Sequence, residues 1–227
     1  MSVPLAEQIF ALSGFDADLG TVLNDENTIT GEDFRDHAAQ WMTEGVKEVI
    51  NIISGNPKYL DLLTTSNTLN TTNGATLSLT NSKLGDVTRS DGTTQQQCRR
   101  IPSSRRGRVS DVNDLMNYAT NTDPVYWIKS GVLEVAPTPD DSNPSHVETI
   151  SYPTFTAGDS GVRDIVTETS IPSFPDEAQT LVVLYAAIKA VEYMMLSEED
   201  QEVYGPQLQA LKTDYQQGIG TIKEGAS

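Results

Sequence analysis

The feature that most constrains the fold is a stretch near the C-terminus whose side chains are apolar on nearly every side of a helix. At helical spacing, residues 178 to 196 carry a row of mostly large apolar side chains and a second, smaller row beside it: Leu181, Leu184, Tyr185, Ile188, Val191 and Met195, then Val183, Ala186, Ala187 and Ala190. Burying each large side chain contributes about 1.5–3 kcal/mol relative to exposure. At least two other elements must therefore cover this helix.

The residues on either side of this stretch mark its start and predict a helical partner. Residues 173 to 177 supply a cap residue, a first-turn proline and two acids, all of which favour the start of a helix. Ser197 with Asp200 predicts a second helix, whose first turns Pro206 ends or kinks. Its narrow apolar face consists of Leu208, Leu211, Tyr215, Ile219 and Ile222. Because the link is very short, we expect an antiparallel hairpin.

A third amphipathic helix is predicted near the N-terminus. Thr30 is its cap residue, Asp33 follows three residues later, and the helix ends at Gly55 and Pro57. Its apolar positions recur at steps of mostly three and four: Phe34, Ala38, Trp41, Met42, Val46, Val49, Ile50 and Ile53. We expect this helix to form the third wall of a bundle with the C-terminal hairpin.

The middle of the chain is rich in Thr, Ser, Asn and Gly and predicts strands. Residues 126 to 135 are typical of a tight hairpin, and residues 146 to 152 of a third strand. Asn73-Gly74 and Asp91-Gly92 predict turns. A short helix is expected at 110 to 119, with Leu115 and Met116 as its buried side.

These elements predict an α+β fold, a three-helix bundle with a β-rich insertion. We expect an N-terminal arm at 1–29, a helical bundle formed by 30–57 and 173–224, and a β-rich insert at 58–172. The arm lacks a sustained period and is polar, as in segments that order on a partner.

The acidic composition limits the partners of the protein. Its 32 acidic and 15 basic side chains give a formal charge of −17, which disfavours a bare duplex-DNA binder because phosphates are neutralised by Lys and Arg. The charge suits either solubility or a surface that faces DNA without binding it. With no signal-peptide pattern and no apolar run of about 18 residues, we expect a soluble protein made and used without export and no membrane partner.

The sequence offers few residues for catalysis or metal binding. His37 and His146 lie outside metal-binding spacings and are interpreted as surface or edge residues. Asp140-Asp141 lacks a calcium-loop pattern and is interpreted as a solvated loop. Cys98, the only cysteine, lies beside two arginines that could lower its thiol pKa, but no histidine accompanies it. We expect no enzyme activity, no cofactor and no metal.

One charged cluster exceeds background. The segment CRRIPSSRRGR holds five of the 15 basic residues, namely Arg99, Arg100, Arg105, Arg106 and Arg108. It is either a solvated loop, a docking patch whose arginine forks bind carboxylates on a partner or on the next copy of this acidic chain, or a phosphate contact.

The order of these parts resembles that of a viral protein family. A helix, a β-rich insert with DPVYWIKSGVLEVAPTP, and a closing PDEAQTLVVLYAAIKAVEYMM helix followed by an amphipathic one are similar to the head-to-tail connector (adaptor) proteins of tailed bacteriophages, including tail tubular protein A of short-tailed phages. The resemblance covers roughly residues 30 to 222. It implies a virion protein of the phage neck, assembled in the host cytoplasm as a ring, commonly of twelve copies. Its partners would be the portal, a tail or nozzle protein, and DNA that passes through without specific binding.

Two other classes of function stay open. The first is a virion or cell-surface module whose β insert binds carbohydrate, with Tyr126 and Trp127 as stacking residues. Since neighbouring strand residues point to opposite faces, only one of the pair could line a given surface. The second is an enzyme of unknown class.

Overall fold

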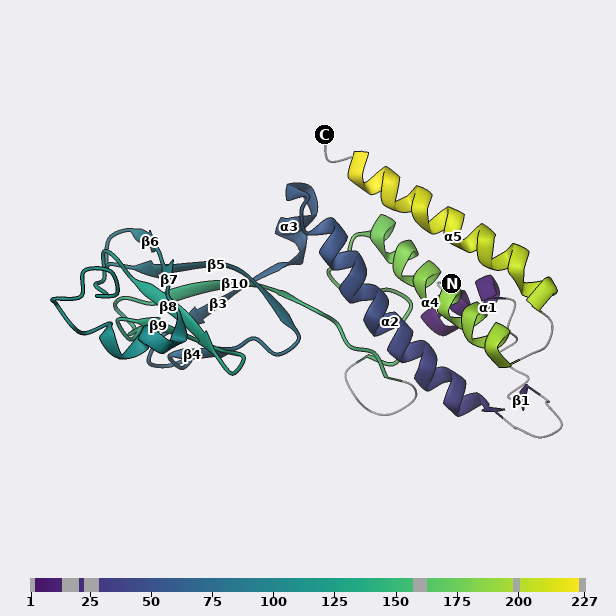
Figure 1. Cartoon of the computed structure of the whole chain (residues 1–227), viewed down its shortest axis with the longest axis horizontal. Coiled ribbons are helices and arrows are strands. Elements are labelled where there is room, and N and C mark those ends of the chain that lie inside the picture. Colours follow the sequence, from purple (N-terminus) through teal and green to yellow (C-terminus); the bar gives the residue numbers. More distant parts are fainter. Residues whose placement is uncertain (1–2, 14–20, 23–28, 157–162, 198–200, 225–227) are drawn as a thin grey trace. The chain divides into compact units, whose positions relative to one another are not determined.

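The computed structural model describes residues 3–13, 21–22, 29–156, 163–197 and 201–224 (Figure 1). The chain forms two compact units. The helical unit comprises Met1–Leu63 and Tyr152–Ser227, and the β unit comprises Thr64–Ser151. The α+β class, the C-terminal helical hairpin, the N-terminal helix of the bundle and the β-rich middle are confirmed.

The helical unit is built around helix α4, Asp176–Ser197. This helix lies between α2, Gly31–Ile53, and α5, Gln201–Glu224, and packs against both (Figure 1). Its buried apolar side chains are Ala178, Leu181, Val182, Val183, Leu184, Ala186, Ala187, Ile188, Ala190, Val191 and Met194. By length and composition alone α4 could also cross a membrane, but here it is the central helix of a bundle.

Polar contacts join the three helices at the rim of this core. The buried Tyr215 hydroxyl of α5 donates a hydrogen bond to Glu48 Oε1 of α2 at 3.1 Å. Burial, followed by the charge of Glu48, raises the pKa of Tyr215. Glu192 of α4 pairs with Lys189 on its own helix at 2.9 Å and with Lys212 of α5 at 3.0 Å. These contacts fix how α5 faces its two neighbours.

The predicted ends of the helices can be compared with the structure at Pro206 but not at the expected cap residues. α5 continues through Pro206, so the proline does not end the helix. The expected cap side chains of Thr30, Asp33 and Ser197, and the whole of Asp200, lie outside the described residues.

A further helix, α1 (Leu5–Ser13), lies in the segment that we interpreted as an arm. It packs on α4 and buries Leu5, Ala6, Ile9 and Phe10. The backbone N–H of Leu5 donates to the Glu168 carbonyl at 2.8 Å, which ties the helix to the segment before α4. Its two turns are too short to give a sustained period, although the four-residue spacing of its apolar pairs was a signal.

Three short elements complete the helical unit. Helix α3, Pro57–Leu63, follows α2 in a region where we expected strands. Its proline occupies the first turn, and Asn56 Oδ1 accepts a hydrogen bond from the Lys58 N–H at 3.0 Å, as at a helix start. Strands β1, Thr21–Val22, and β2, Ile29–Thr30, pair antiparallel.

The described part of the β unit contains two four-stranded sheets. The first has the order β3-β10-β5-β6 and the second the order β4-β9-β8-β7. Their bounds are β3 Thr64–Leu69, β10 Ser145–Ser151, β5 Ser82–Ser90 and β6 Gln95–Gln97, then β4 Thr76–Ser78, β9 Val132–Ala136, β8 Val125–Lys129 and β7 Arg99–Arg100. The predicted hairpin is β8-β9, and the predicted third strand is β10. Gly74 and Gly92 have φ near +95°, as the predicted turns require.

The two faces of the β8-β9 hairpin pack into two different cores. Leu133 and Val135 of β9 pack with Leu69, Val87 and Val147 of the first sheet, and the intervening core includes Cys98. Strand residues alternate between faces, so Val125 and Trp127 of β8 point the opposite way. They form a second core on the outer face of the second sheet with Ile101, Ala119 and Ala136.

A close helix contact in the bundle predicts that Gly45 cannot be replaced freely. A methyl group on Gly45 of α2 would lie 2.9 Å from Tyr185 Cδ1 and 3.3 Å from Tyr185 Cβ, whereas one on Gly220 of α5 meets nothing within 4 Å. We expect Gly45→Ala to destabilise the helical unit by about 1–3 kcal/mol through overpacking. Gly220→Ala should stabilise it by about 0.5–1 kcal/mol through helix propensity. Urea unfolding followed by circular dichroism measures both, and a Gly45→Ala variant as stable as Gly220→Ala contradicts the packing.

Candidate docking surface

The five arginines of the cluster lie on the edge strand of the second sheet and on the 3-10 helix that follows it. Arg99 and Arg100 form β7, which pairs parallel with β8 at the edge of the sheet. The 3-10 helix η2, Ser103–Arg108, carries the other three after Pro102 and buries none of its side chains. All five guanidinium groups belong to exposed residues of β7 and η2.

An apolar anchor holds this segment on the sheet. Ile101 is buried against Trp127 in the outer core, and its N–H donates to the Tyr126 carbonyl at 2.9 Å. Val109 packs on the same core from the other end of η2. The arginines between these two anchors therefore face outward.

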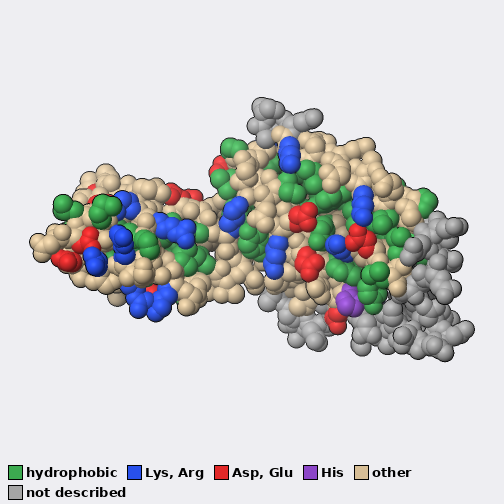
Figure 2. Space-filling view, viewed as in Figure 1, with side chains coloured by type: hydrophobic (Ala, Val, Ile, Leu, Met, Phe, Trp, Pro, Cys, Tyr) green, Lys and Arg blue, Asp and Glu red, His purple; other side chains and the backbone are tan. Residues whose placement is uncertain are grey.

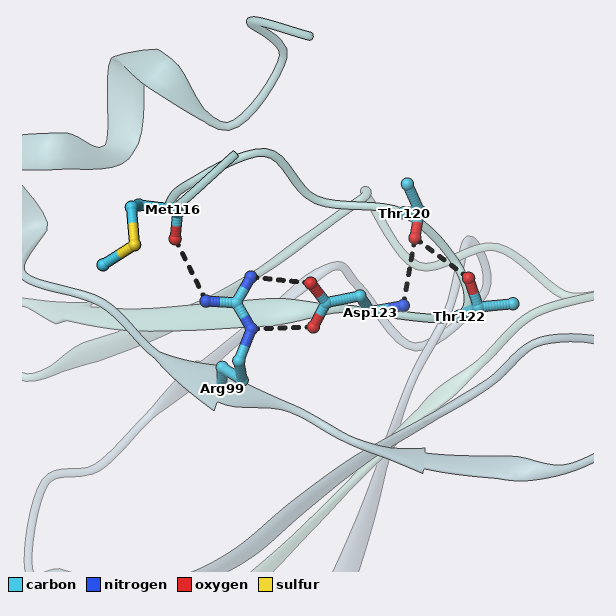
Figure 3. A network of polar contacts seen from close by, with 5 residues as sticks. All are labelled: Arg99, Met116, Thr120, Thr122 and Asp123. Carbon is cyan, nitrogen blue, oxygen red and sulfur yellow. Dashed lines mark hydrogen bonds and ion pairs between the residues drawn. The ribbon is translucent and has the colours of Figure 1, made fainter. Parts of the chain in front are cut away.

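Arg99 is bound within its own chain (Figure 3). Its Nε and Nη2 donate to the two oxygens of Asp123 at 2.7 and 2.8 Å, and its Nη1 donates to the Met116 carbonyl at 3.1 Å. Hydrogen bonding from Arg99 lowers the pKa of Asp123, and the same pair raises the pKa of Arg99. Arg99 thus fixes a loop instead of offering its fork to a partner.

A second carboxylate shapes the same loop. Asp114 accepts two hydrogen bonds from Asn117 Nδ2 at 2.9 Å and one from Arg108 at 3.4 Å. The bonds from Asn117, and then Arg108, lower the pKa of Asp114. With the Asn113 N–H bonded to Asp111 Oδ1 at 3.0 Å, these side chains satisfy the backbone in turns.

The predicted helix at 110–119 is therefore wrong. Residues 111 to 117 form successive turns, because their Asp and Asn side chains compete with helical hydrogen bonds. Leu115 and Met116, which we expected to be buried, are 86% and 72% exposed, and Val112 is 62% exposed. The inner side of the loop is already filled by Ala119 and Val109.

Three apolar side chains thus stand in solvent beside arginines. For Arg100, Arg105 and Arg106, the described part of the chain supplies no ion-pair partner. An open hollow of about 480 Å³ adjoins Arg100 and is lined by Arg100, Ile101, Pro102, Ser103 and Ile128. We call Arg100, Arg105, Arg106, Val112, Leu115 and Met116 the docking surface. Its mixture of arginines and large apolar side chains is typical of protein interfaces.

The charge of the protein is divided unequally between the two units. The β unit contains eight of the 15 basic residues and nine of the 32 acidic ones, so it is nearly neutral. The helical unit contains seven basic and 23 acidic residues. In Figure 2, Lys and Arg side chains are interspersed with hydrophobic ones on the visible face of the β unit.

The other candidate residues take structural roles. His37 stacks on Trp41 and lies against Tyr193, and His146 Nδ1 lies 3.2 Å from Thr68 Oγ1. Asp140 Oδ1 accepts hydrogen bonds from the N–H groups of Ser142 and Asn143 at 2.9 and 2.7 Å. Among the described residues no group of three His, Cys, Asp or Glu could hold a metal.

Two sequence interpretations change at buried residues. Burial raises the pKa of the Cys98 thiol to about 12, the reverse of the lowering that neighbouring arginines suggested, because the thiol points into the core. Trp127 is also buried, and Tyr126 packs on the opposite core, so this pair offers no exposed stacking platform for a carbohydrate.

Sequence analysis missed one supporting residue, Arg89 of β5. It is 1% exposed, and its Nη1 donates to the Pro137 carbonyl at 2.6 Å while Nη2 contacts Asn121 Oδ1 at 3.3 Å. Desolvation lowers its pKa, partly opposed by the charge of Asp140. The sequence could have indicated this, because Arg89 lies two residues after Val87 in the region predicted to form strands, and side chains two residues apart point to the same face of a sheet.

Comparison with known protein families identifies a match. The sequence model of the family described as SU10 adaptor protein matches residues 12–227, which include all of the β unit and the helical unit apart from its first 11 residues. No curated protein matches the chain.

Asp123 is expected to hold the loop only while ionised. Its lowered pKa means that the stabilisation is present above the unfolded value of about 3.9 and is lost as pH falls through the folded value. Asp123→Asn should therefore speed amide hydrogen exchange at residues 112–120 at neutral pH, and the difference from the parent should shrink in acid. Asp141→Asn, in another loop, is the control. Equal exchange in parent and Asp123→Asn at neutral pH contradicts this role.

Proposed function

The chain belongs to the SU10 adaptor protein family, and from this premise we propose that it is a ring-forming head-to-tail adaptor that joins the portal to the tail and surrounds the DNA channel. Membership confirms the resemblance to phage adaptors drawn from the sequence. The family is a structural one, and the chain is a virion component. Its place in the neck, its ring and its partners are proposals that rest on this match.

The observation that carries the proposal is that the family match extends across both units. The helical bundle alone is a common architecture and points to no function. A match that runs from the bundle through the β unit and back into the bundle links this particular arrangement to adaptors. We propose that the two compact units are its two functional domains, with a ring of about twelve copies as the expected assembly.

The unequal charge supports a DNA channel formed by the helical unit. Duplex DNA binds proteins chiefly through neutralisation of phosphates by Lys and Arg. The helical unit has 23 acidic and seven basic residues, so it offers few Lys and Arg side chains that could neutralise phosphates. DNA would then pass without binding specifically to the wall.

Assembly is the direct test of the proposal. Light scattering and negative-stain imaging of the purified full chain, alone and with the portal protein of the same phage, should show rings of uniform copy number in at least one condition. The portal belongs in the test because an adaptor can stay monomeric until a ring presents a template. A monomer in both conditions would overturn the proposal.

The exposed arginines are proposed to contribute to that assembly. Replacing Arg105 and Arg106 with Ser should leave the circular dichroism spectrum unchanged and weaken assembly, because η2 buries none of its side chains. Lys129→Ser with Lys223→Ser removes the same charge elsewhere and should assemble as the parent does. Rising salt should weaken the parent assembly, since exposed charges are screened. Assembly that is indifferent to both the arginines and salt removes their role.

A further inference from the structure

A second exposed surface complements the docking surface in character. On α3, Leu60 and Leu62 are 37% and 51% exposed and stand on either side of the exposed Asp61. We call Leu60, Asp61 and Leu62 the α3 surface. It combines apolar side chains with an acid, where the docking surface combines apolar side chains with arginines. The two surfaces belong to different units of the chain.

We propose that the docking surface of one copy binds the α3 surface of the next copy. This inference rests on the proposed ring and names the contact that holds neighbouring subunits together. Because the two surfaces differ, the contact is head-to-tail, and repetition of a head-to-tail contact closes into a ring when the rotation allows. Each copy then uses both of its surfaces.

Apolar burial supplies the centre of the proposed contact. Leu115 and Met116 are exposed on a loop. The side of this loop that faces the sheet already packs on the outer core, so Leu115 and Met116 cannot be buried by folding back onto it. Leu62, the more exposed of the two leucines of the α3 surface, offers them an apolar counterpart. Contact would remove the apolar area of these side chains from water, which favours association.

Charge selects the helical unit as the counterpart. Asp61 has no basic partner in the described part of the chain, and the neighbouring Lys58 extends over the Tyr59 ring at 5.0 Å. Arginine forks at Arg105 and Arg106 match a carboxylate in geometry. The acidic excess of the whole helical unit adds longer-range attraction within the screening length.

Cross-linking of the assembled protein tests the contact. Cys98 is the only cysteine and is buried, so a Leu62→Cys and Leu115→Cys double variant presents two reactive thiols of known position. Treatment of the assembly, with portal protein where the chain needs it, with a short bismaleimide should give a ladder of dimers, trimers and larger species. The control pairs Leu115→Cys with Leu196→Cys, which is 87% exposed outside the α3 surface, and should give no ladder.

The outcomes separate this inference from the proposed function. Rings without a ladder, or a ladder equal to that of the control, overturn the contact and leave the adaptor proposal standing. A cross-linked monomer shows that the two surfaces meet within one chain and also overturns it. Absence of any assembly, with the portal present, overturns both.

A charge exchange checks the contact without cysteines. Asp61→Arg should weaken assembly by roughly tenfold or more, as loss of one interface hot spot does. Arg105→Asp with Arg106→Asp should do the same. Combining all three substitutions should restore part of the loss, and a combination no better than the worse single change contradicts direct pairing.

Discussion

The burial of α4 is the constraint on which the rest of the structure depends. Its apolar surface faces α2 and α5 and also α1, so elements from both ends of the chain must meet around it. The β unit can then only be an excursion that leaves the bundle and returns to it. β3 and β10, the first and last strands of the excursion, satisfy this requirement by pairing antiparallel, with Thr64 opposite Ile150. The chain therefore enters and leaves the β unit at adjacent positions, and an insertion of 88 residues need not pull the bundle apart.

The division of charge follows the same boundary. The helical unit carries most of the acidic excess. The β unit is close to neutral, and five of its arginines are exposed on β7 and η2. Copies of a protein with evenly spread negative charge repel one another at every approach. Segregation lowers that repulsion in one orientation, where the β unit of one copy meets the helical unit of another. The unequal division of charge cannot be read from the formal charge of the whole chain. It appears only when the charges are counted separately for each unit.

What could be predicted from the sequence follows from the strength of each local pattern. Long helices with sustained periods, and the hairpin with its Ser-Gly turn, follow from hydrophobic spacing alone. Helix α1 was not predicted, because its nine residues form too few turns to show a sustained hydrophobic period. The segment from Asp111 to Asn117 misled because its apolar pair resembles a helix face, whereas its carboxylates satisfy the backbone in turns. The arginine cluster was visible in the sequence, but the pairing of Arg99 with Asp123, 24 residues away, and the inward direction of Cys98 required the sheet.

The polar contacts of the loop and its exposed apolar residues have a common physical reason. A flexible loop that bears Leu115 and Met116 would lose conformational entropy on binding and could also fold its apolar side chains onto itself. Here Arg99 fixes the Met116 carbonyl, Asp114 fixes Asn117, and the outer core occupies the inner side. The loop is already ordered in the free subunit, so binding a partner costs less conformational entropy. The same rigidity keeps the apolar side chains in water, which costs free energy in the isolated subunit and is relieved only when another surface covers them.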